Sequence, residues 1–592
     1  MSAAPPARRV PDAEASGGRL RAGAPVLLPA LTVLGTAVVT SFTAVVATSG
    51  GAAPLLLARV GARLALDLSW SAVLGILAVL LLVLPEGDGR RGRLLDVAAV
   101  AAGVAAIAAG LTAFLLYLGR APAMSAPAFG PGLVAFLSEA VIGRTWLVAA
   151  ILAAVLSAAL VAVRSSSGLV LLALLAVASL VPVALQSATP DGTLAGARTT
   201  AAAAFVLLLA VGTWIGVVPA PLGQRRGTGA VRMLTTICPV LAIAAVLLGA
   251  LPPLPLGLPL AALLLVALLV ARLSARPLPS SVLLGVAGGL VIAARVLQSA
   301  QSAPSTAAGR TSPAEILTGA PLPPVPSAGS LLLGWQPDPV WLLLSGGLLV
   351  GYLGAVRRLR RSGGRWPAIR VVSWVGGVLL LVWTTSGGPA VYAAVLLSAS
   401  LGRYAALVAA VPLLLAGGAP LRLLAATRPF RARAQSRLGA LARPVPAAVL
   451  AVGAFLALFA TPLLRWSVTG AVGAEEAVLQ SLLTGALLVS ALLRAPRRTA
   501  IAVTAVLLLV ETAAAAFLGV GRGLLLADWY GAMGWGTDAL VDQRLGAVLA
   551  WAITVVATLV LLVAALRRPA VAPAVVGPDR PRSPAGRSEV PA

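Results

Sequence analysis

The sequence of 592 residues contains no histidine and no lysine, so all 44 basic residues are arginine. Catalytic triads that depend on histidine are therefore excluded, as is a phosphate-binding loop of the form GxxxxGKS or GxxxxGKT, which needs lysine. The single cysteine, Cys238, excludes an intrachain disulfide and any zinc or iron–sulfur site built from several cysteines. Because the carboxylates are scattered over loops and separate apolar segments, we expect no enzyme.

Charge is also scarce, since 10% of the residues are charged, whereas 59% are hydrophobic and the mean hydropathy is +1.00. This balance lies far from that of a soluble domain. Apolar runs of ~20 residues, enough to cross a bilayer, recur along the chain. Their backbones must pair internally and the alternation of a barrel strand is missing, so helices are predicted. The expected fold class is all-α, a polytopic integral membrane bundle of about sixteen transmembrane helices in two modules.

The expected spans are separated by short polar or Pro/Gly-rich breaks. They are 26–48, 68–85, 94–118, 145–163, 167–186, 199–220, 233–252, 255–272, 279–297, 339–356, 368–386, 391–416, 445–464, 475–495, 499–519 and 543–566.

One polar stretch divides these apolar runs. Residues 301–338 are rich in Pro and Ser and too polar to cross a bilayer, so we expect an external linker there. About nine spans precede it, in a membrane module at 23–300, and about seven follow, in a second module at 339–568. The terminal segments 1–22 and 569–592 are rich in Pro and Arg, and we expect disordered cytoplasmic tails.

The arginine clusters predict the orientation in the membrane. If the N-terminus is cytoplasmic, alternation of the spans brings every dense cluster to the cytoplasmic side, as the positive-inside rule requires. We therefore expect a plasma-membrane protein with both termini cytoplasmic and the lipid bilayer as its partner. The arginines are spread over loops beside the membrane rather than gathered on one soluble face, so no nucleic-acid partner is expected.

Motifs in both modules carry a family resemblance. The segments RRLRRSGGRWPAIRVVSW, LLLAGGAPLRLL and LLLADWYGAMGWGTDALVDQRLGAVLAW resemble the cytochrome c oxidase assembly factor CtaG family over roughly residues 333–568. Its most specific parts are LADWY and DQRLG, and the residues of these motifs that we single out are Asp528, Trp529, Asp542 and Gln543. The segment TTAAAAFVLLLAVGTWIGVV, residues 199–218, resembles the copper-resistance CopD family. The chain is thus similar to an actinobacterial-type fusion of a CopD-like module with a CtaG-like module.

This resemblance implies copper homeostasis and delivery of copper to a respiratory oxidase, with oxidase subunits or a copper chaperone as partners. The family histidines, however, are missing. The positions at or near which they are implied hold Ser400, Tyr404, Arg443, Gln480 and Ala515, and in the first module Gln186 and Leu207. None of these side chains is a good copper ligand. We therefore assign no metal ligand and expect no cofactor, with copper implied by the resemblance only.

A charged residue, Arg403, lies near the middle of an expected span. A lone charge there costs ~3 kcal/mol, so a partner inside the protein is expected. Glu511 is an acidic residue near the middle of another late span. We predict that Arg403 and Glu511 pair in the former metal pocket, where Tyr404 and Ser400 satisfy the remaining donors. A structural ion pair is favoured there over a substrate or proton site.

Residues near the expected span ends have plainer interpretations. Glu475 and Glu476 are predicted to be interfacial anchors or helix N-terminal charges. Five tryptophans are predicted to form a belt at the membrane interface, namely Trp335, Trp341, Trp366, Trp529 and Trp535.

Two functions remain open. The first is copper homeostasis and oxidase assembly, performed as a scaffold or accessory factor without direct metal binding. The alternative is a repurposed transporter or permease that uses the polar pocket for an anion or small solute. The surviving DQRLG and LADWY motifs favour the first, whereas the loss of every histidine favours the second. Resemblance at the level of the fold does not by itself establish an activity.

Overall fold

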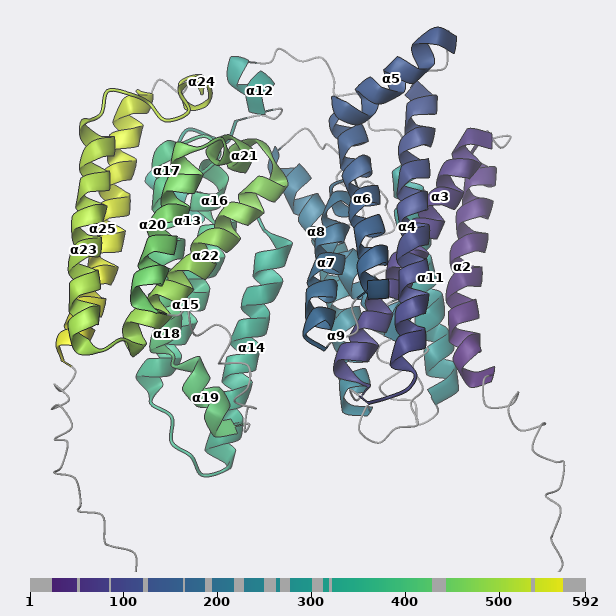
Figure 1. The fold of residues 1–592 in the computed structure, drawn as a ribbon, viewed down its shortest axis with the longest axis horizontal. Coiled ribbons are helices and arrows are strands. Elements are labelled where there is room, and N and C mark those ends of the chain that lie inside the picture. Colours follow the sequence, from purple (N-terminus) through teal and green to yellow (C-terminus); the bar gives the residue numbers. More distant parts are fainter. Residues whose placement is uncertain are drawn as a thin grey trace, which may run out of the picture.

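The helices of the protein run along one common direction and form two groups side by side, one from each half of the chain (Figure 1). This computed structural model describes residues 24–49, 54–84, 87–120, 126–162, 166–186, 194–217, 228–249, 262–263, 265–266, 277–300, 312–318, 322–427, 443–533 and 538–567. Over these residues the chain forms helices and no strand, which confirms the all-α expectation.

The first half contributes the longer run of simple antiparallel helices. They are α2 (Ala24–Ser49), α3 (Pro54–Leu82), α4 (Arg91–Arg120), α5 (Ala126–Ser138), α6 (Val141–Ala162), α7 (Ser166–Leu185), α8 (Leu194–Val217), α9 (Thr228–Leu247) and α11 (Pro277–Ala300).

The second half is more broken. Its elements are α12 (Pro313–Thr318), α13 (Ala328–Leu333), α14 (Pro339–Arg361), α15 (Ala368–Ser386), α16 (Gly388–Tyr392), α17 (Leu397–Ala405), the π-helical turn η1 (Ala406–Ala410), α18 (Val411–Gly417), α19 (Pro420–Thr427), α20 (Pro444–Ala460), α21 (Leu463–Thr469), α22 (Ala471–Arg494), α23 (Arg497–Val520), α24 (Ala527–Tyr530) and α25 (Ala539–Leu566).

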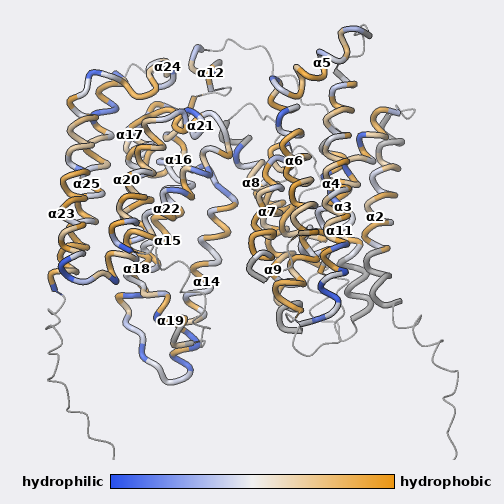
Figure 2. The backbone as a smooth tube through the Cα atoms, in the orientation of Figure 1, coloured by the Kyte–Doolittle hydropathy of each residue, from blue (hydrophilic) through white to orange (hydrophobic). Residues whose placement is uncertain are grey.

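Among the described residues, eleven helices are long and apolar enough to cross a membrane, or twelve if the bent pair α20 and α21 is one span. Figure 2 shows that hydrophobic residues cover their middles, with hydrophilic residues gathered toward the ends. Every expected span except 255–272, which lies almost entirely outside the described residues, overlaps one or more helices. The expected span 391–416 is divided among α16, α17, η1 and α18. The chain is therefore a multi-pass membrane protein.

Helix α3 begins earlier than the sequence predicted. The apolar run suggested a span at 68–85, whereas the helix starts at Pro54 and includes Arg63 and Asp67. Both side chains are buried. The hydropathy pattern failed here because it treats a charge as the end of a span, although a buried ion pair lets the helix continue.

Small residues let the first-half helices approach closely. Along α4, Ala98, Ala102, Ala105 and Ala109 are all fully buried. The hydroxyl of Ser157 on α6 donates to the carbonyl oxygen of Ala99 at 2.7 Å, which brings α6 directly against this face. Small faces of this kind are typical of helix packing in membranes.

The second half departs from straight helices at two places. Helices α20 and α21 meet at an angle of 68°. The turn η1 interrupts the span that contains Arg403, and a Cβ at Gly485 of α22 would lie 2.0 Å from the carbonyl oxygen of Val408 in this turn. Only glycine permits this approach, so α22 supports the widened turn.

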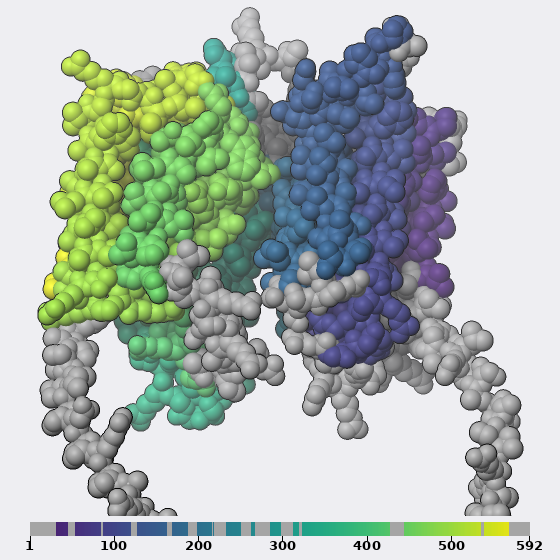
Figure 3. Space-filling model, in the orientation of Figure 1, coloured from purple at the N-terminus to yellow at the C-terminus, as the bar shows by residue number. Residues whose placement is uncertain are grey.

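The described part of the predicted linker 301–338 packs against the second half. Ala314 of α12 is buried in its core, and the Tyr392 hydroxyl donates to the Pro324 carbonyl oxygen at 2.8 Å. Figure 3 shows the two halves as neighbouring lobes. The predicted tails 1–22 and 569–592 lie outside the described residues.

Candidate functional site

The motif residue Asp542 holds the start of another helix, α17. Asp542 of α25 accepts hydrogen bonds from the backbone N–H of Ser398, at 3.0 Å, and from the Ser398 hydroxyl. Helix α17 begins here and its own N-cap residue, Leu396, supplies no side-chain cap. A carboxylate at this point satisfies free N–H groups of the first turn. Asp542 therefore caps α17 from another helix.

Gln543 organises the turn between α23 and α24. It is 1% exposed, and its amide oxygen accepts from the Leu525 N–H at 2.8 Å. Its amide nitrogen donates to the carbonyl oxygens of Gly523 and Leu518 at 3.0 and 3.2 Å. Both the oxygen and the nitrogen of the amide thus bond to backbone groups, which explains why a buried polar side chain is tolerated.

The prediction of a tryptophan belt is wrong for two of its members. Trp529 and Trp341 are each 3% exposed. The indole N–H of Trp529 donates to the Ala394 carbonyl oxygen at 2.7 Å, and that of Trp341 donates to the Glu475 carboxylate at 2.6 Å. Trp335 is 57% exposed, and Trp535 lies outside the described residues. Asp528, beside Trp529, forms an exposed ion pair with Arg465.

Three of the four predicted pocket residues meet at one small polar cavity. Ser400, Arg403 and Tyr404 line a space of about 40 Å³, which Arg198 of the first half also lines. The guanidinium of Arg198 donates to the Val468 carbonyl oxygen at 2.9 Å. The cavity therefore lies where the two halves of the chain meet.

The acidic groups that act on Arg403 are Glu475 and Asp338. Asp338 caps α14 by accepting from the N–H groups of Val340 and Trp341. Glu475, predicted to be an interfacial anchor or a helix N-terminal charge, receives the indole N–H of Trp341. Both carboxylates thus bond to the first turn of α14. Neither was predicted to interact with Arg403.

The predicted Arg403–Glu511 ion pair is not formed among the described residues. Glu511 on α23 instead accepts a hydrogen bond from the Thr558 hydroxyl of α25 at 2.9 Å. It lines a second cavity of about 130 Å³, which shares Tyr404 with the first. Arg403 and Glu511 therefore line different cavities, and α23, which carries Glu511, packs against α25.

A third and larger cavity, of about 810 Å³, adjoins the motif residues. Its walls are mainly apolar, and Asp542, Ser398 and Arg403 provide polar groups in its lining. Motif and cavity therefore belong to the same region of the bundle, between α17 and α25.

The residues at the implied histidine positions do not fit copper. Ser400, Tyr404 and Ala515 line the two smaller cavities, while Gln480 donates its amide to the Ala454 carbonyl oxygen. Hydroxyl and amide groups are poor ligands for Cu(I), which prefers thiolate, thioether and imidazole. Over the part of the chain that the structure describes, no group of three or more Asp, Glu or Cys residues is arranged to hold a metal ion.

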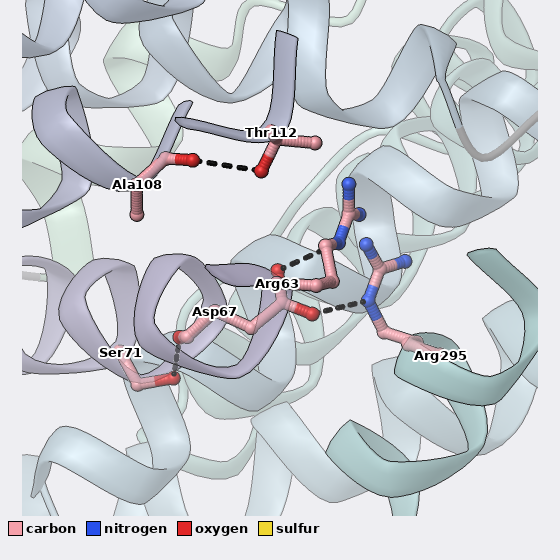
Figure 4. Close-up of polar contacts among 6 residues, drawn as sticks. All are labelled: Arg63, Asp67, Ser71, Ala108, Thr112 and Arg295. Atoms are coloured by element: carbon pink, nitrogen blue, oxygen red, sulfur yellow. Dashed lines mark hydrogen bonds and ion pairs between the residues drawn. The ribbon is translucent and has the colours of Figure 1, made fainter. Parts of the chain in front are cut away.

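Sequence reasoning missed a buried ion cluster in the first half (Figure 4). The Asp67 carboxylate faces Arg63 at 3.5 Å and Arg295 at 3.4 Å, and all three side chains are at most 4% exposed. The guanidinium of Arg63 also lies over the Trp146 ring, 5.4 Å from its centre. The Arg63 and Asp67 spacing of four residues was the available signal, but Arg295 is far away in sequence.

Comparison with known families identifies part of this multi-pass helical protein. Residues 350–570 match the family model of the cytochrome c oxidase caa3 assembly factor (Caa3_CtaG). This part of the chain is a CtaG-type domain, which confirms the resemblance stated for the second half. The CopD-like character of residues 23–300 stays a prediction.

The chain is also similar to mycobacterial proteins whose names state no activity. Uncharacterised proteins of Mycobacterium bovis and Mycobacterium tuberculosis are each 28% identical over 274 residues, covering 42% of this chain and 41% of theirs. One of Mycobacterium leprae is 27% identical over 291 residues, covering 45% and 44%. The matched region thus spans less than half the length of these relatives. No solved structure matches the chain.

Proposed function

We propose that this protein is a non-enzymatic membrane factor that assists the assembly of a cytochrome c oxidase, through protein contacts rather than by holding copper itself. The observation that carries this proposal is the CtaG-type domain at 350–570. Within it, Asp542, Gln543 and Trp529 retain an ordered hydrogen-bond network. A scaffold needs such an ordered internal framework, whereas it does not need metal ligands.

The absence of a fitting ligand set separates this role from direct copper delivery. The cavity that Tyr404 and Ala515 line offers a phenol, a carboxyl and apolar walls. These groups are not a ligand set for Cu(I), so we propose that the copper is carried by a partner, such as an oxidase subunit or a copper chaperone. We propose the plasma membrane as its location, with both termini cytoplasmic, on the arginine distribution alone.

The CopD-like resemblance adds a proposed role of residues 23–300 in copper homeostasis. Growth of a deletion strain at raised copper concentration tests this part separately. The permease alternative has no supporting observation among the comparisons, and we do not propose it.

A deletion strain tests the assembly role. Deleting the gene should lower cytochrome c oxidase activity and oxidase-bound copper in isolated membranes, and the wild-type gene should restore both. Asp542→Asn should restore them only in part, because it weakens the cap of α17, while Asp538→Asn on the same helix serves as the matched control. Normal oxidase in the deletion strain would overturn the proposal.

A copper measurement tests the scaffold part. The purified protein is loaded anaerobically with Cu(I), loose metal is removed, and bound copper is measured beside a CtaG-type protein that keeps its histidines. We expect background copper in this protein and stoichiometric copper in the control. Stoichiometric copper in both would contradict the assignment of a scaffold without a metal site.

A further inference from the structure

A carboxyl group without a cationic partner lies near the middle of a spanning helix in the second half. Glu511 of α23 accepts one hydrogen bond, at Oε1, from Thr558. Its second oxygen, Oε2, is enclosed and has no hydrogen-bond partner among the described residues. A buried polar atom left unsatisfied costs ~1–3 kcal/mol, so its retention calls for an explanation.

The enclosed oxygen belongs to a residue that lines the cavity of about 130 Å³ between α17, α20, α22, α23 and α25. Most of the lining is aliphatic, which makes Glu511 one of its few polar groups. A second is Tyr404, which is 8% exposed and whose hydroxyl also has no partner among the described residues. The cavity therefore combines apolar walls with hydrogen-bonding capacity that the protein leaves unused.

The cavity reaches the surface of the bundle. Val510 of α23 and Trp551 of α25 line it and are 37% and 39% exposed. Figure 1 shows this helix pair at the edge of the second half, away from the first. A ligand dissolved in the bilayer can therefore enter without crossing the core.

Size and lining together indicate an aromatic ring. An apolar cavity of about 150 Å³ is known to hold benzene, so one of this size admits a single ring. Three aromatic side chains, Tyr404, Phe455 and Trp551, line it, and rings favour edge or offset contacts with one another. A linear acyl chain would gain none of these contacts.

The carboxyl group indicates what the ring must carry. A hydroxyl group both donates and accepts, so it satisfies the Glu511 carboxyl whether this is ionised or neutral. We propose that this cavity binds a phenol-sized aromatic ring bearing a hydroxyl group, whose hydroxyl is hydrogen-bonded to Glu511. This site goes beyond the assembly role and does not depend on it.

Binding is measured with the full-length protein in lipid nanodiscs, by ¹⁹F NMR of 4-fluorophenol, with 4-fluorotoluene as the matched ligand that lacks the hydroxyl. Empty nanodiscs correct for partition into lipid. We expect saturable binding of 4-fluorophenol, with 4-fluorotoluene bound about tenfold more weakly, as the loss of one hydrogen bond to a carboxyl predicts. Binding no greater than in empty nanodiscs would overturn the proposal, as would equal binding of the two ligands.

Variants locate the site. Glu511→Leu should weaken 4-fluorophenol binding about tenfold and leave 4-fluorotoluene unchanged, while Glu511→Gln retains most of the affinity. Glu476→Leu removes a carboxyl that does not line the cavity and should change neither ligand. Ala515→Leu fills the cavity while the Glu511 carboxyl is retained, so it should abolish binding of both ligands even if Glu511→Leu fails to fold. Unchanged binding in folded Ala515→Leu protein would place the ligand elsewhere and sink the assignment.

Discussion

The two halves of the molecule handle buried charge in different ways. In the first half, Arg63 and Arg295 both face the Asp67 carboxylate at short range. The contact between Asp67 and Arg295, which are 228 positions apart, ties α3 to α11. In the second half, Arg403 makes no ion pair within 4 Å among the described residues, and Glu511 bonds to a hydroxyl. The first arrangement holds helices together, whereas the second leaves charged groups facing cavities.

Helix geometry accounts for this difference. In the first half, the Asp67 cluster joins α3 to α11, two helices that pack directly against each other. The second half contains the π-helical turn η1 and the bend between α20 and α21. Such irregular turns leave space between helices and are frequent at functional sites. In this protein, the buried charges that line cavities lie in the half whose helices are irregular.

The largest effect is expected from breaking the first-half cluster. Asp67→Ala should lower the free energy of unfolding by about 3–5 kcal/mol, because it leaves two buried arginines without their carboxylate. Thermal unfolding in detergent measures this. The triple variant Arg63→Met, Asp67→Leu, Arg295→Met should lose less than Asp67→Ala alone. If the triple variant loses more, the cluster is not held by charge compensation.

A smaller effect is expected at the cap that Asp542 provides for α17. Asp542→Asn should cost about 1–2 kcal/mol, because the hydrogen bonds to Ser398 lose their charge assistance. Hydrogen exchange measured by mass spectrometry should quicken at the first turn of α17 and not at α22. Uniform quickening over both helices would instead indicate a global loss of stability.

Arg403 should contribute less to stability than Asp67 does, which sharpens the contrast between the halves. Arg403→Met should lower the free energy of unfolding by about 1 kcal/mol, because no direct ion pair is broken and the methionine fills much of the same volume. The same unfolding experiment applies. A loss as large as that of Asp67→Ala would show that Glu475 and Asp338 compensate Arg403 as closely as Asp67 compensates its arginines.

The smallest effect is expected for a partly exposed ion pair in the first half. Hydrogen bonds from Arg90 lower the pKa of Asp88 from 3.8 to about 2. The depressed pKa means that the pair stabilises the protein above about pH 4, and that this stabilisation is lost as the pH falls toward 2. The melting temperatures of wild type and Asp88→Asn should differ slightly at pH 6 and converge near pH 2. A difference that persists at pH 2 would contradict this origin.

Several residues of the candidate site could be predicted from the sequence, but the partners of its charged side chains could not. Ser400, Arg403 and Tyr404 line one cavity because they lie within five residues of one another on the same helix. The assignment of Glu511 to the same ion pair was wrong, because membrane depth says nothing about which side of a helix faces which neighbour. The same limit explains why three residues near Arg403 were missed, namely Arg198, Asp338 and Glu475. Each lies near the beginning of a different helix, and the sequence does not show that these helices meet.

The sequence by itself determined that the chain is helical and crosses a membrane many times, because hydropathy over each span depends only on the residues of that span. It also determined that histidine-based metal chemistry is excluded. Only the tertiary structure decided that Asp67 meets Arg295, that Asp542 caps α17, and that Glu511 faces a cavity. These contacts join helices far apart in the chain, and their formation depends on how the helices pack rather than on local pattern.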